Sequence, residues 1–153
     1  SGESMKETCH INEIIDSCLV MLNSEIKDRI EIIKHYTSDL TPIPGNVSSL
    51  FQVFLNLLAN AGQAIEGFGQ ITITTSQDDQ QIKVTIGDDG LGISNENISK
   101  IMDPFFTTKP PGEGTGLGLS ITYEIIQNHG GSITVKSELE KGTTFMLFFP
   151  IPR

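Results

Sequence analysis

The chain has 153 residues, the size of one ordinary domain, and its composition of 37% hydrophobic and 19% charged residues is typical of a globular protein. Its formal net charge of −9 repels a phosphate backbone, so we expect no nucleic-acid partner. Polar residues interrupt every long apolar stretch, and we expect no membrane-spanning segment, no membrane contact and no signal peptide.

The N-terminal end divides into a short leading segment and one domain. We interpret residues 1–9 as an N-terminal segment that is in part a remnant of cloning, and residues 10–153 as a single domain. Cys9 and Cys18 lie nine positions apart on a predicted helix, which places them on opposite faces. They cannot form a disulfide within that helix, and two free thiols favour a reducing cytoplasm.

The first half of the chain contains two predicted helices. Apolar residues at helical spacing predict a helix over residues 11–28, and a strand follows over residues 30–36. Two prolines and a glycine predict a loop over residues 41–46. The pattern then becomes helical and very apolar over residues 47–65, which predicts a core helix.

The second half alternates strands with shorter helices. Strands are predicted by alternating apolar and polar residues, and a glycine pair at 130–131 predicts the end of the last helix. The elements expected are strands over 71–76 and 82–86, helices over 96–102 and 117–128, and strands over 132–137 and 143–149. We therefore expect an α+β fold, an α/β sandwich whose mixed, mostly antiparallel sheet carries its helices on one face.

A long segment rich in Pro, Gly and Thr separates the last two helices. Residues 103–116 have no predicted structure of their own, and such long segments in compact domains are usually functional lids or disordered. Phe105 and Phe106 lie within it and should dock on a surface, which packing explains as well as function does. Lys109 is the best cation there for an anionic ligand, although a solvated lysine is the ordinary case.

Two asparagines share one face of the predicted core helix. Asn56 and Asn60 lie four residues apart among apolar neighbours, and buried amides need partners. One explanation is hydrogen bonding to nearby backbone. The other is that their carbonyl oxygens help to hold a hydrated Mg²⁺ ion, which takes few protein ligands beside the phosphates of a substrate.

Two glycine-rich turns add a second kind of signal. Asp88 and Asp89 precede Gly90 and Gly92 at the end of a strand. One interpretation is an ordinary turn, in which Asp and Gly are the commonest residues. The other is that Asp88 accepts a hydrogen bond from an exocyclic amine of a ligand. Residues 112–120 contain four glycines and lead into a helix, whose free N–H groups and positive dipole end suit a polyphosphate. A flexible hinge is the alternative for this second turn, which has neither the Walker nor the dinucleotide pattern.

Together and in this order, these motifs resemble the N, G1, F and G2 boxes of the histidine kinase catalytic domain, over nearly the whole chain. The N box is Gln52-Val53-Phe54-Leu55-Asn56-Leu57-Leu58-Ala59-Asn60-Ala61 and the G1 box is Asp88-Asp89-Gly90-Leu91-Gly92-Ile93. The F box is Asp103-Pro104-Phe105-Phe106-Thr107-Thr108-Lys109 and the G2 box is Gly114-Thr115-Gly116-Leu117-Gly118-Leu119-Ser120-Ile121. The last strand, with Gly142-Thr143-Thr144-Phe145, is similar as well.

The resemblance implies a Bergerat-type fold that binds ATP with Mg²⁺. It implies that Asn60 is the Mg²⁺ ligand, that Asn56 lies near the phosphates, and that Asp88 recognises adenine, helped by Thr144 through water. Three residues would shape the adenine pocket: Gly90, Gly92 and Ile93. Six would form a mobile lid over the phosphates: Gly114, Thr115, Gly116, Leu117, Gly118 and Leu119.

One position favours phosphoryl transfer over hydrolysis. Related ATPases of the gyrase, chaperone and mismatch-repair type resemble this site but have a glutamate, as general base, where this chain has Asn56. An amide has no basic lone pair that would accept a proton, so we expect ATP to be held for transfer and hydrolysed poorly. Gln63 replaces a basic residue that some family members use to contact phosphate, which leaves Lys109 to act alone.

The histidine that would receive the phosphoryl group is absent. His10, His35 and His129 all lack the acidic neighbour and helical setting of the family's phosphoacceptor. The resemblance therefore implies a separate dimerisation domain as partner, a response regulator as the next acceptor, and a monomeric, cytoplasmic domain whose parent protein is either free or anchored in the inner membrane. A nucleotide-gated interaction module and a serine kinase of the anti-sigma type remain as alternatives.

Overall fold

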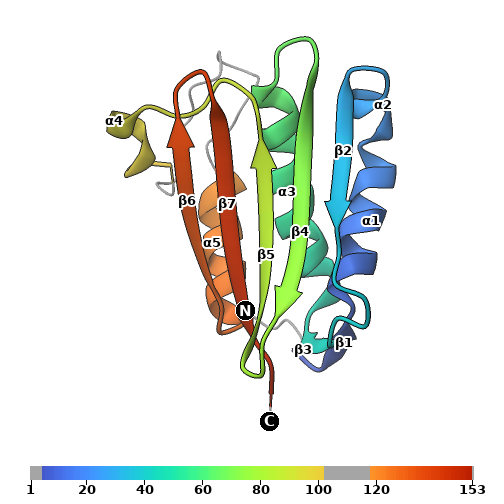
Figure 1. Ribbon diagram of the computed structural model, residues 1–153. Helices are drawn as coiled ribbons and strands as arrows, with labels where there is room; N and C mark the ends of the chain where they lie inside the picture. The colour runs from blue at the N-terminus through green and yellow to red at the C-terminus, as the bar shows by residue number, and fades with distance from the viewer. Residues whose placement is uncertain (1–4, 102–117, 153) are drawn as a thin grey trace.

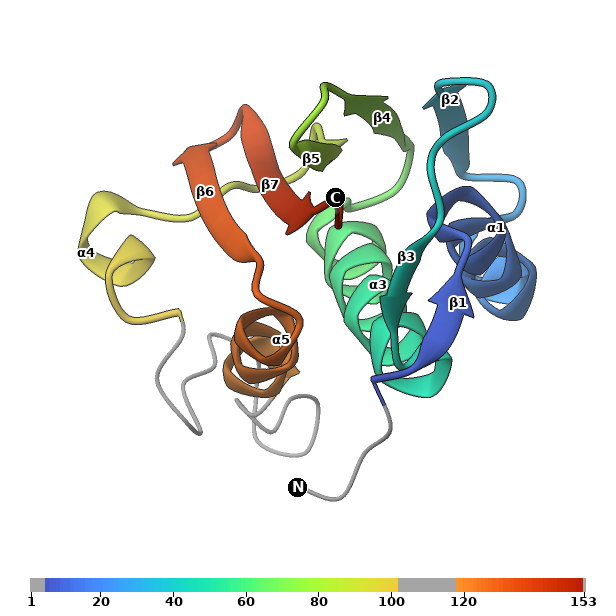
Figure 2. The same ribbon diagram turned by 90° about the horizontal axis from the view of Figure 1, so that it is seen from below.

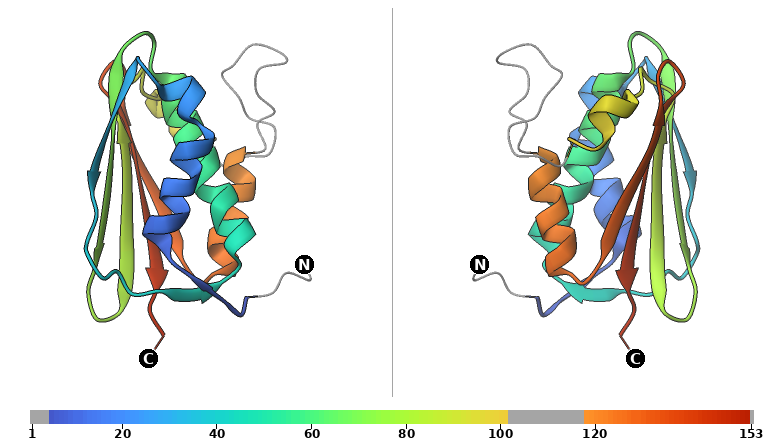
Figure 3. Two further views of the ribbon diagram at one scale, coloured as in Figure 1. Left: turned by 90° about the vertical axis from the view of Figure 1, so that its right-hand side faces the viewer. Right: turned by 90° about the vertical axis from the view of Figure 1, so that its left-hand side faces the viewer.

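The protein is a two-layer sandwich, in which helices cover one face of the main sheet (Figure 3). The computed structural model describes residues 5–101 and 118–152. The sheet has five strands in the order β2-β4-β5-β7-β6 (Figure 1). They are β2 (Ile30–His35), β4 (Gly69–Gln77), β5 (Gln81–Asp88), β6 (Ser132–Glu138) and β7 (Gly142–Pro150).

The sheet is mixed and mostly antiparallel, as predicted. β2 runs parallel to β4, and every other neighbouring pair is antiparallel. On the covered face, alternate residues of the central strands are buried, as in Ile82, Val84 and Ile86 of β5. A period of two is what one buried face imposes on a strand.

The helical layer contains α1 (Ile11–Met21), α3 (Val47–Ala64) and α5 (Gly118–Asn128). Viewed from below, α3 lies between the other two helices, directly under the sheet (Figure 2). Phe54 of α3 is fully buried, with its ring centroid 6.4 Å from that of Phe149 on β7. Two short helices complete the layer: α2 (Asn23–Ile26) and α4 (Asn95–Ile98). In the described part of the chain, no helix combines the length and the apolar character needed to cross a membrane.

The N-terminal end of α3 is held by its own cap and by a residue from a distant part of the sequence. At its N-terminus, the Asn46 side chain accepts a hydrogen bond from the Ser49 amide at 2.8 Å. The Asn46 amide donates to Nε2 of His129 at 3.1 Å, and Nδ1 of the same ring lies 2.8 Å from the Ile125 carbonyl oxygen. Both ring nitrogens of His129 are therefore engaged, and this histidine fixes the start of α3 against the end of α5.

Three predictions about the N-terminal half were wrong. The helix predicted over residues 11–28 is divided at Leu22, where ψ is 3°, into α1 and the short α2. The helical stretch ends at Ile26, because Lys27 has an extended ψ of 138° and Asp28 a left-handed φ of +68°. The predicted loop over residues 41–46 contains β3 (Ile43–Gly45), which pairs with β1 (Glu7–Cys9). Cys9 therefore lies on a strand, although both cysteines are buried free thiols.

The remaining elements were confirmed to within a few residues. The helix predicted over 96–102 is the shorter α4, and the helix predicted over 117–128 is α5. Gly130 ends α5 with a φ of +73°, in the left-handed region that favours glycine. The segment predicted over residues 103–116 lies outside the described residues.

Candidate nucleotide-binding site

The candidate residues that the structure describes gather at one end of the sandwich. α3 and β5 both end there, and β7 and α5 both begin there (Figures 1 and 3). Asn56 and Asn60 belong to the second half of α3, and Asp88 is the last residue of β5. Three elements that are far apart in the sequence thus bring an amide pair, a carboxylate and a glycine-rich turn into one region.

Asp88 points toward the helical layer. It continues the alternation of Ile82, Val84 and Ile86, so its side chain lies on the covered face of the sheet. Oδ1 accepts a hydrogen bond from the Gly90 amide at 2.9 Å. Burial raises the pKa of the Asp88 carboxyl above its usual value of 3.8, although hydrogen bonds from the main chain of Gly90 and Thr143 oppose the shift. A partly dehydrated carboxylate of this kind is a strong acceptor for a ligand amine.

The neighbour of Asp88 on β7 is Thr143. These two residues pair across the antiparallel strands, and Thr143 is buried on the same face. Thr144 pairs with Gly87 and points to the open face, where a Cβ on Gly87 would meet its Oγ1 at 3.2 Å. The structure therefore does not bring Thr144 to Asp88, and a one-residue shift in a strand decides which face a side chain occupies.

Ser137 connects Thr143 to the predicted pocket residue Ile93. The Ser137 hydroxyl lies 2.7 Å from Oγ1 of Thr143, accepts a hydrogen bond from the Ile93 amide at 2.7 Å and contacts the Gly142 carbonyl oxygen at 2.9 Å. This network fixes the main chain after the glycine-rich turn to the start of β7. Sequence reasoning missed Ser137 and Thr143, because the position of a hydroxyl in such a network depends on strand pairing.

Main chain packs directly against main chain at two glycines of the turn. A Cβ on Gly90 would lie 2.4 Å from the Ala64 carbonyl oxygen, and one on Gly92 would lie 2.1 Å from the Glu138 carbonyl oxygen. Gly92 also has a φ of +76°, which an L side chain rarely adopts. The Leu91 amide, between them, donates to the Ala64 carbonyl oxygen at 2.9 Å. The turn is thereby fastened to the last residue of α3.

The two asparagines are partly exposed, and they differ in their contacts. The Asn56 amide nitrogen lies 3.5 Å from the hydroxyl of Thr122, a buried residue of α5. Asn60, one turn further along α3, makes no recorded side-chain hydrogen bond to any residue within 5–101 and 118–152. Within those ranges, no group of three or more His, Cys, Asp or Glu side chains is placed to hold a metal ion.

Only the end of the predicted lid is described. Gly118 is the first residue of α5, and Leu119 packs half-buried against the core. Lys109, Gly114, Thr115, Gly116 and Leu117 lie outside the described residues.

Residues 45–153, more than half of the chain, match the family model described as histidine kinase-, DNA gyrase B-, and HSP90-like ATPase. The chain belongs to this ATPase family. Family membership implies that the chain binds ATP, and the sandwich described above is the Bergerat-type fold that its motifs predicted.

The curated relatives of this ATPase domain include sensor and sporulation kinases of bacteria. The chain is 37% identical to the sensor histidine kinase ZraS of Escherichia coli K12, over 92% of the chain and 30% of that protein. It is also 37% identical to sporulation kinase A of Bacillus subtilis, over 96% of the chain and 24% of that protein. The chain thus spans less than a third of the length of these relatives.

Solved structures give the same result. The catalytic domain of histidine kinase ThkA superimposes with a TM-score of 0.84 at 31% identity, over 95% of this chain and 98% of that one. Full-length ShkA in complex with AMPPNP has a TM-score of 0.84 at 26% identity, over 97% of this chain and 31% of that one. The ATPase domain is therefore of the kind found in sensor histidine kinases.

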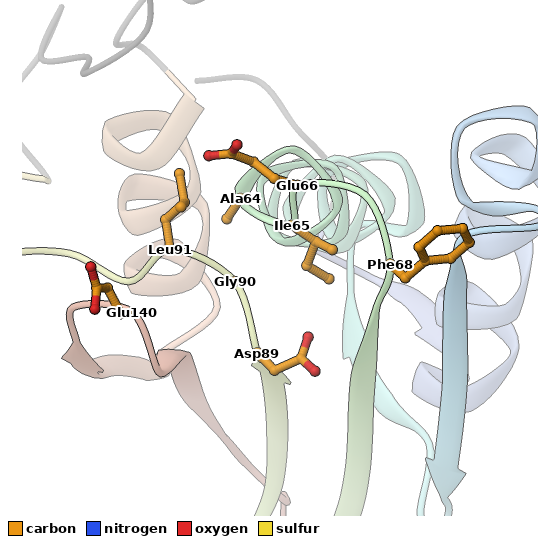
Figure 4. Close-up of a pocket in the computed structure, with 8 residues that line it drawn as sticks. All are labelled: Ala64, Ile65, Glu66, Phe68, Asp89, Gly90, Leu91 and Glu140. Carbon is orange, nitrogen blue, oxygen red and sulfur yellow. The ribbon is translucent and has the colours of Figure 1, made fainter.

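A pocket of about 220 Å³ lies beside the turn of this ATPase domain (Figure 4). Among the described candidate residues, only Gly90 lines it; the lining is Ala64, Ile65, Glu66, Phe68, Asp89, Gly90, Leu91 and Glu140. Asp89 faces this pocket, whereas Asp88 faces the helical layer, because successive side chains of a strand point to opposite sides.

Proposed function

We propose that this domain binds ATP with Mg²⁺ and donates the γ-phosphoryl group to a histidine on a separate dimerisation domain. The observation that carries the proposal is the carboxylate of Asp88, half-buried on the helix-facing side of the sheet where β5, α3 and β7 meet. Its remaining lone pairs suit the exocyclic amine of adenine.

The residues present fit a Mg²⁺ ion that is held mainly by phosphate and water. Asn60 offers one carboxamide oxygen near the helix end, and Asn56 lies one turn away on the same face of α3. When bound, the ion would neutralise charge on the transferring phosphoryl group. Asn60 would be the protein ligand, and the hydrogen bond of Asn56 to Thr122 would orient the amide of Asn56 toward the phosphates.

Transfer is favoured over hydrolysis at the same place. Asn56 cannot act as a general base toward water, since an amide has no basic lone pair. Positioning and charge neutralisation are what phosphoryl transfer requires of the protein, and both are available without a base on this helix. Asn56→Glu should therefore raise the slow ATP hydrolysis of the chain, and an unchanged hydrolysis rate would count against this account.

The acceptor histidine belongs elsewhere in our proposal. His129 is unsuitable because both of its ring nitrogens are engaged, by the Asn46 amide and the Ile125 carbonyl oxygen. His35 ends β2 and His10 precedes α1, so neither lies at the candidate site. We propose that the phosphoryl group passes from the separate histidine to a response regulator. Monomeric behaviour and a cytoplasmic location stay predictions.

Calorimetric titration of the chain with ATP in Mg²⁺ buffer, with GTP as the control, tests the binding step. We expect saturable binding that is selective for ATP and stronger with Mg²⁺ than with EDTA. Incubation with γ-labelled ATP and a histidine-bearing dimerisation domain then tests transfer, which we expect only when both are present. ATP binding without transfer would favour the nucleotide-gated interaction module, and label on a serine of a partner would favour the anti-sigma type of kinase.

A further inference from the structure

Arg29 lies outside the candidate site, in the turn between α2 and β2, and uses its guanidinium to hold main chain. Nη2 donates to the Gly62 carbonyl oxygen at 2.9 Å, and Nη1 donates to those of Ile65 at 3.0 Å and Gly67 at 3.2 Å. Nε donates to the Glu25 carbonyl oxygen at 3.0 Å. Four of the five N–H donors of a guanidinium are thus directed at carbonyl groups.

Three of these four carbonyl groups belong to the end of α3 and the turn after it. The last carbonyl groups of a helix have no partner within it, and they carry the negative end of the helix dipole. α3 has no basic residue in its own last turn, so a cation there must come from another segment. Arg29, more than thirty residues earlier in the chain, supplies both the donors and the positive charge.

The same helix end holds the nucleotide-site turn from its other side. The Ala64 carbonyl oxygen accepts from the Leu91 amide at 2.9 Å, and the Leu91 carbonyl oxygen accepts from the Glu140 amide at 2.7 Å. Ala64, Ile65, Gly90 and Leu91 lie next to one another in Figure 4. A shift of the α3 end would therefore move the Gly90–Leu91 main chain, because the main chain of Ala64 is in direct contact with Gly90.

We infer that Arg29 is a positioning residue for the nucleotide site. It holds the C-terminal end of α3, and through the bond from Leu91 to Ala64 it fixes the turn that follows Asp88 relative to Asn60. In the described residues, the hydrogen bonds of Arg29 all go to main-chain carbonyl groups and none to a candidate ligand-binding side chain, so its effect is indirect. This inference rests on the proposed function, in which that turn and Asn60 contact the same nucleotide.

The test compares Arg29→Met with Lys27→Met, which removes the same charge from an exposed position two residues earlier. ATP affinity is measured calorimetrically with Mg²⁺ at a temperature where circular dichroism shows both variants folded. We expect Arg29→Met to bind ATP about tenfold or more weakly, since small displacements of positioned groups have large effects. Lys27→Met should bind like the wild type, and Arg29→Lys should lie between, because an ammonium keeps the charge without the planar fork.

A purely structural role would lower the melting temperature of Arg29→Met and leave the ATP affinity of the folded protein unchanged, which would overturn the inference. An equal loss in Lys27→Met would overturn it as well, because net charge would then explain the effect. If Arg29→Met does not fold, Arg29→Lys is followed by amide hydrogen exchange, and the Leu91 amide should exchange faster than in the wild type. A Leu91 amide that exchanges at the wild-type rate in Arg29→Lys would refute the proposed connection. If the wild type itself binds no ATP, the proposed function fails rather than the role of Arg29.

Discussion

Replacing Asp88 by Asn would test the nucleotide site at its most informative atom. The change keeps the shape of the side chain, and Oδ1 can still accept from the Gly90 amide, as it does at 2.9 Å in the wild type. What is lost is the charged acceptor for the ligand amine, and an N–H group takes the place of one oxygen. A hydrogen bond to a charged group contributes about 1.5–3 kcal/mol, so ATP affinity should fall roughly 10- to 100-fold.

The stability of the Asp88→Asn variant should move differently from its affinity. Burial raises the pKa of Asp88 in the folded state above the usual 3.8, so the folded protein binds more protons than the unfolded one between these two values. The free energy of unfolding of the wild type therefore falls as the pH rises through that window. At neutral pH, where Asp88 is ionised, this loss is complete. Asn carries no charge, so thermal melts of the variant should lack this loss and give a melting temperature at pH 7 no lower than that of the wild type.

The matched control is Asp89→Asn, one position further along. Asp89 is exposed and accepts from the Gln70 amide at 2.9 Å, a bond that an amide oxygen keeps. Calorimetry with ATP and GTP should show a weakened preference for ATP in Asp88→Asn only, since guanine carries an oxygen where adenine carries an amine. Unchanged ATP affinity in Asp88→Asn, with the control also unchanged, would remove Asp88 from the site.

Three further substitutions test the framework around the site, each by thermal or denaturant unfolding. Gly92→Ala should lower the free energy of unfolding by about 2 kcal/mol or more, because φ is +76° and the new Cβ would meet the Glu138 carbonyl oxygen. A melting temperature within error of the wild type would show that the turn can relax. Phe54→Ala, in the core, should lower the free energy of unfolding by about 3–5 kcal/mol. The control Phe68→Ala, at a side chain that is 84% exposed, should lower it by roughly 0.5 kcal/mol or less. Similar losses in the two variants would contradict the packing described. Asn46→Ala removes the N-cap of α3 and should lower the free energy of unfolding by about 1 kcal/mol. An unchanged free energy of unfolding would mean that the cap does not stabilise the fold.

The sheet and the main helices were predictable because their apolar periods are long and regular. Apolar residues alternate with polar ones in β5 and recur at helical spacing in α3, because each element buries one face. Such a pattern can be read directly from the sequence. β1 and β3 were missed because three-residue strands have too few positions to show a period, and Pro44 favoured a loop. Pro44 is tolerated because this two-stranded pair is itself all edge.

At the site, residues within one motif were predictable and the bonds between motifs were not. The spacing of Asn56 and Asn60 places them on one helix face whatever else the fold does. The choice between Thr143 and Thr144 needs the strand register, which pairs Thr143 with Asp88. Arg29 carried no signal at all, because a guanidinium that binds main-chain carbonyl groups has no partner side chain that a sequence pattern could reveal.

The close approaches at Gly90, Gly92 and Gly142 limit how this site can be re-engineered. At each of them a carbonyl oxygen occupies the volume that a Cβ would take, and at Gly142 it is the carbonyl oxygen of Asp88. One boundary of the proposed site is therefore polypeptide backbone, whose outline no choice of side chain can alter. Libraries aimed at nucleotide analogues with bulkier bases would gain little from randomising the glycines. Variation is better placed at Ile93 and Thr143, whose side chains can be shortened or lengthened.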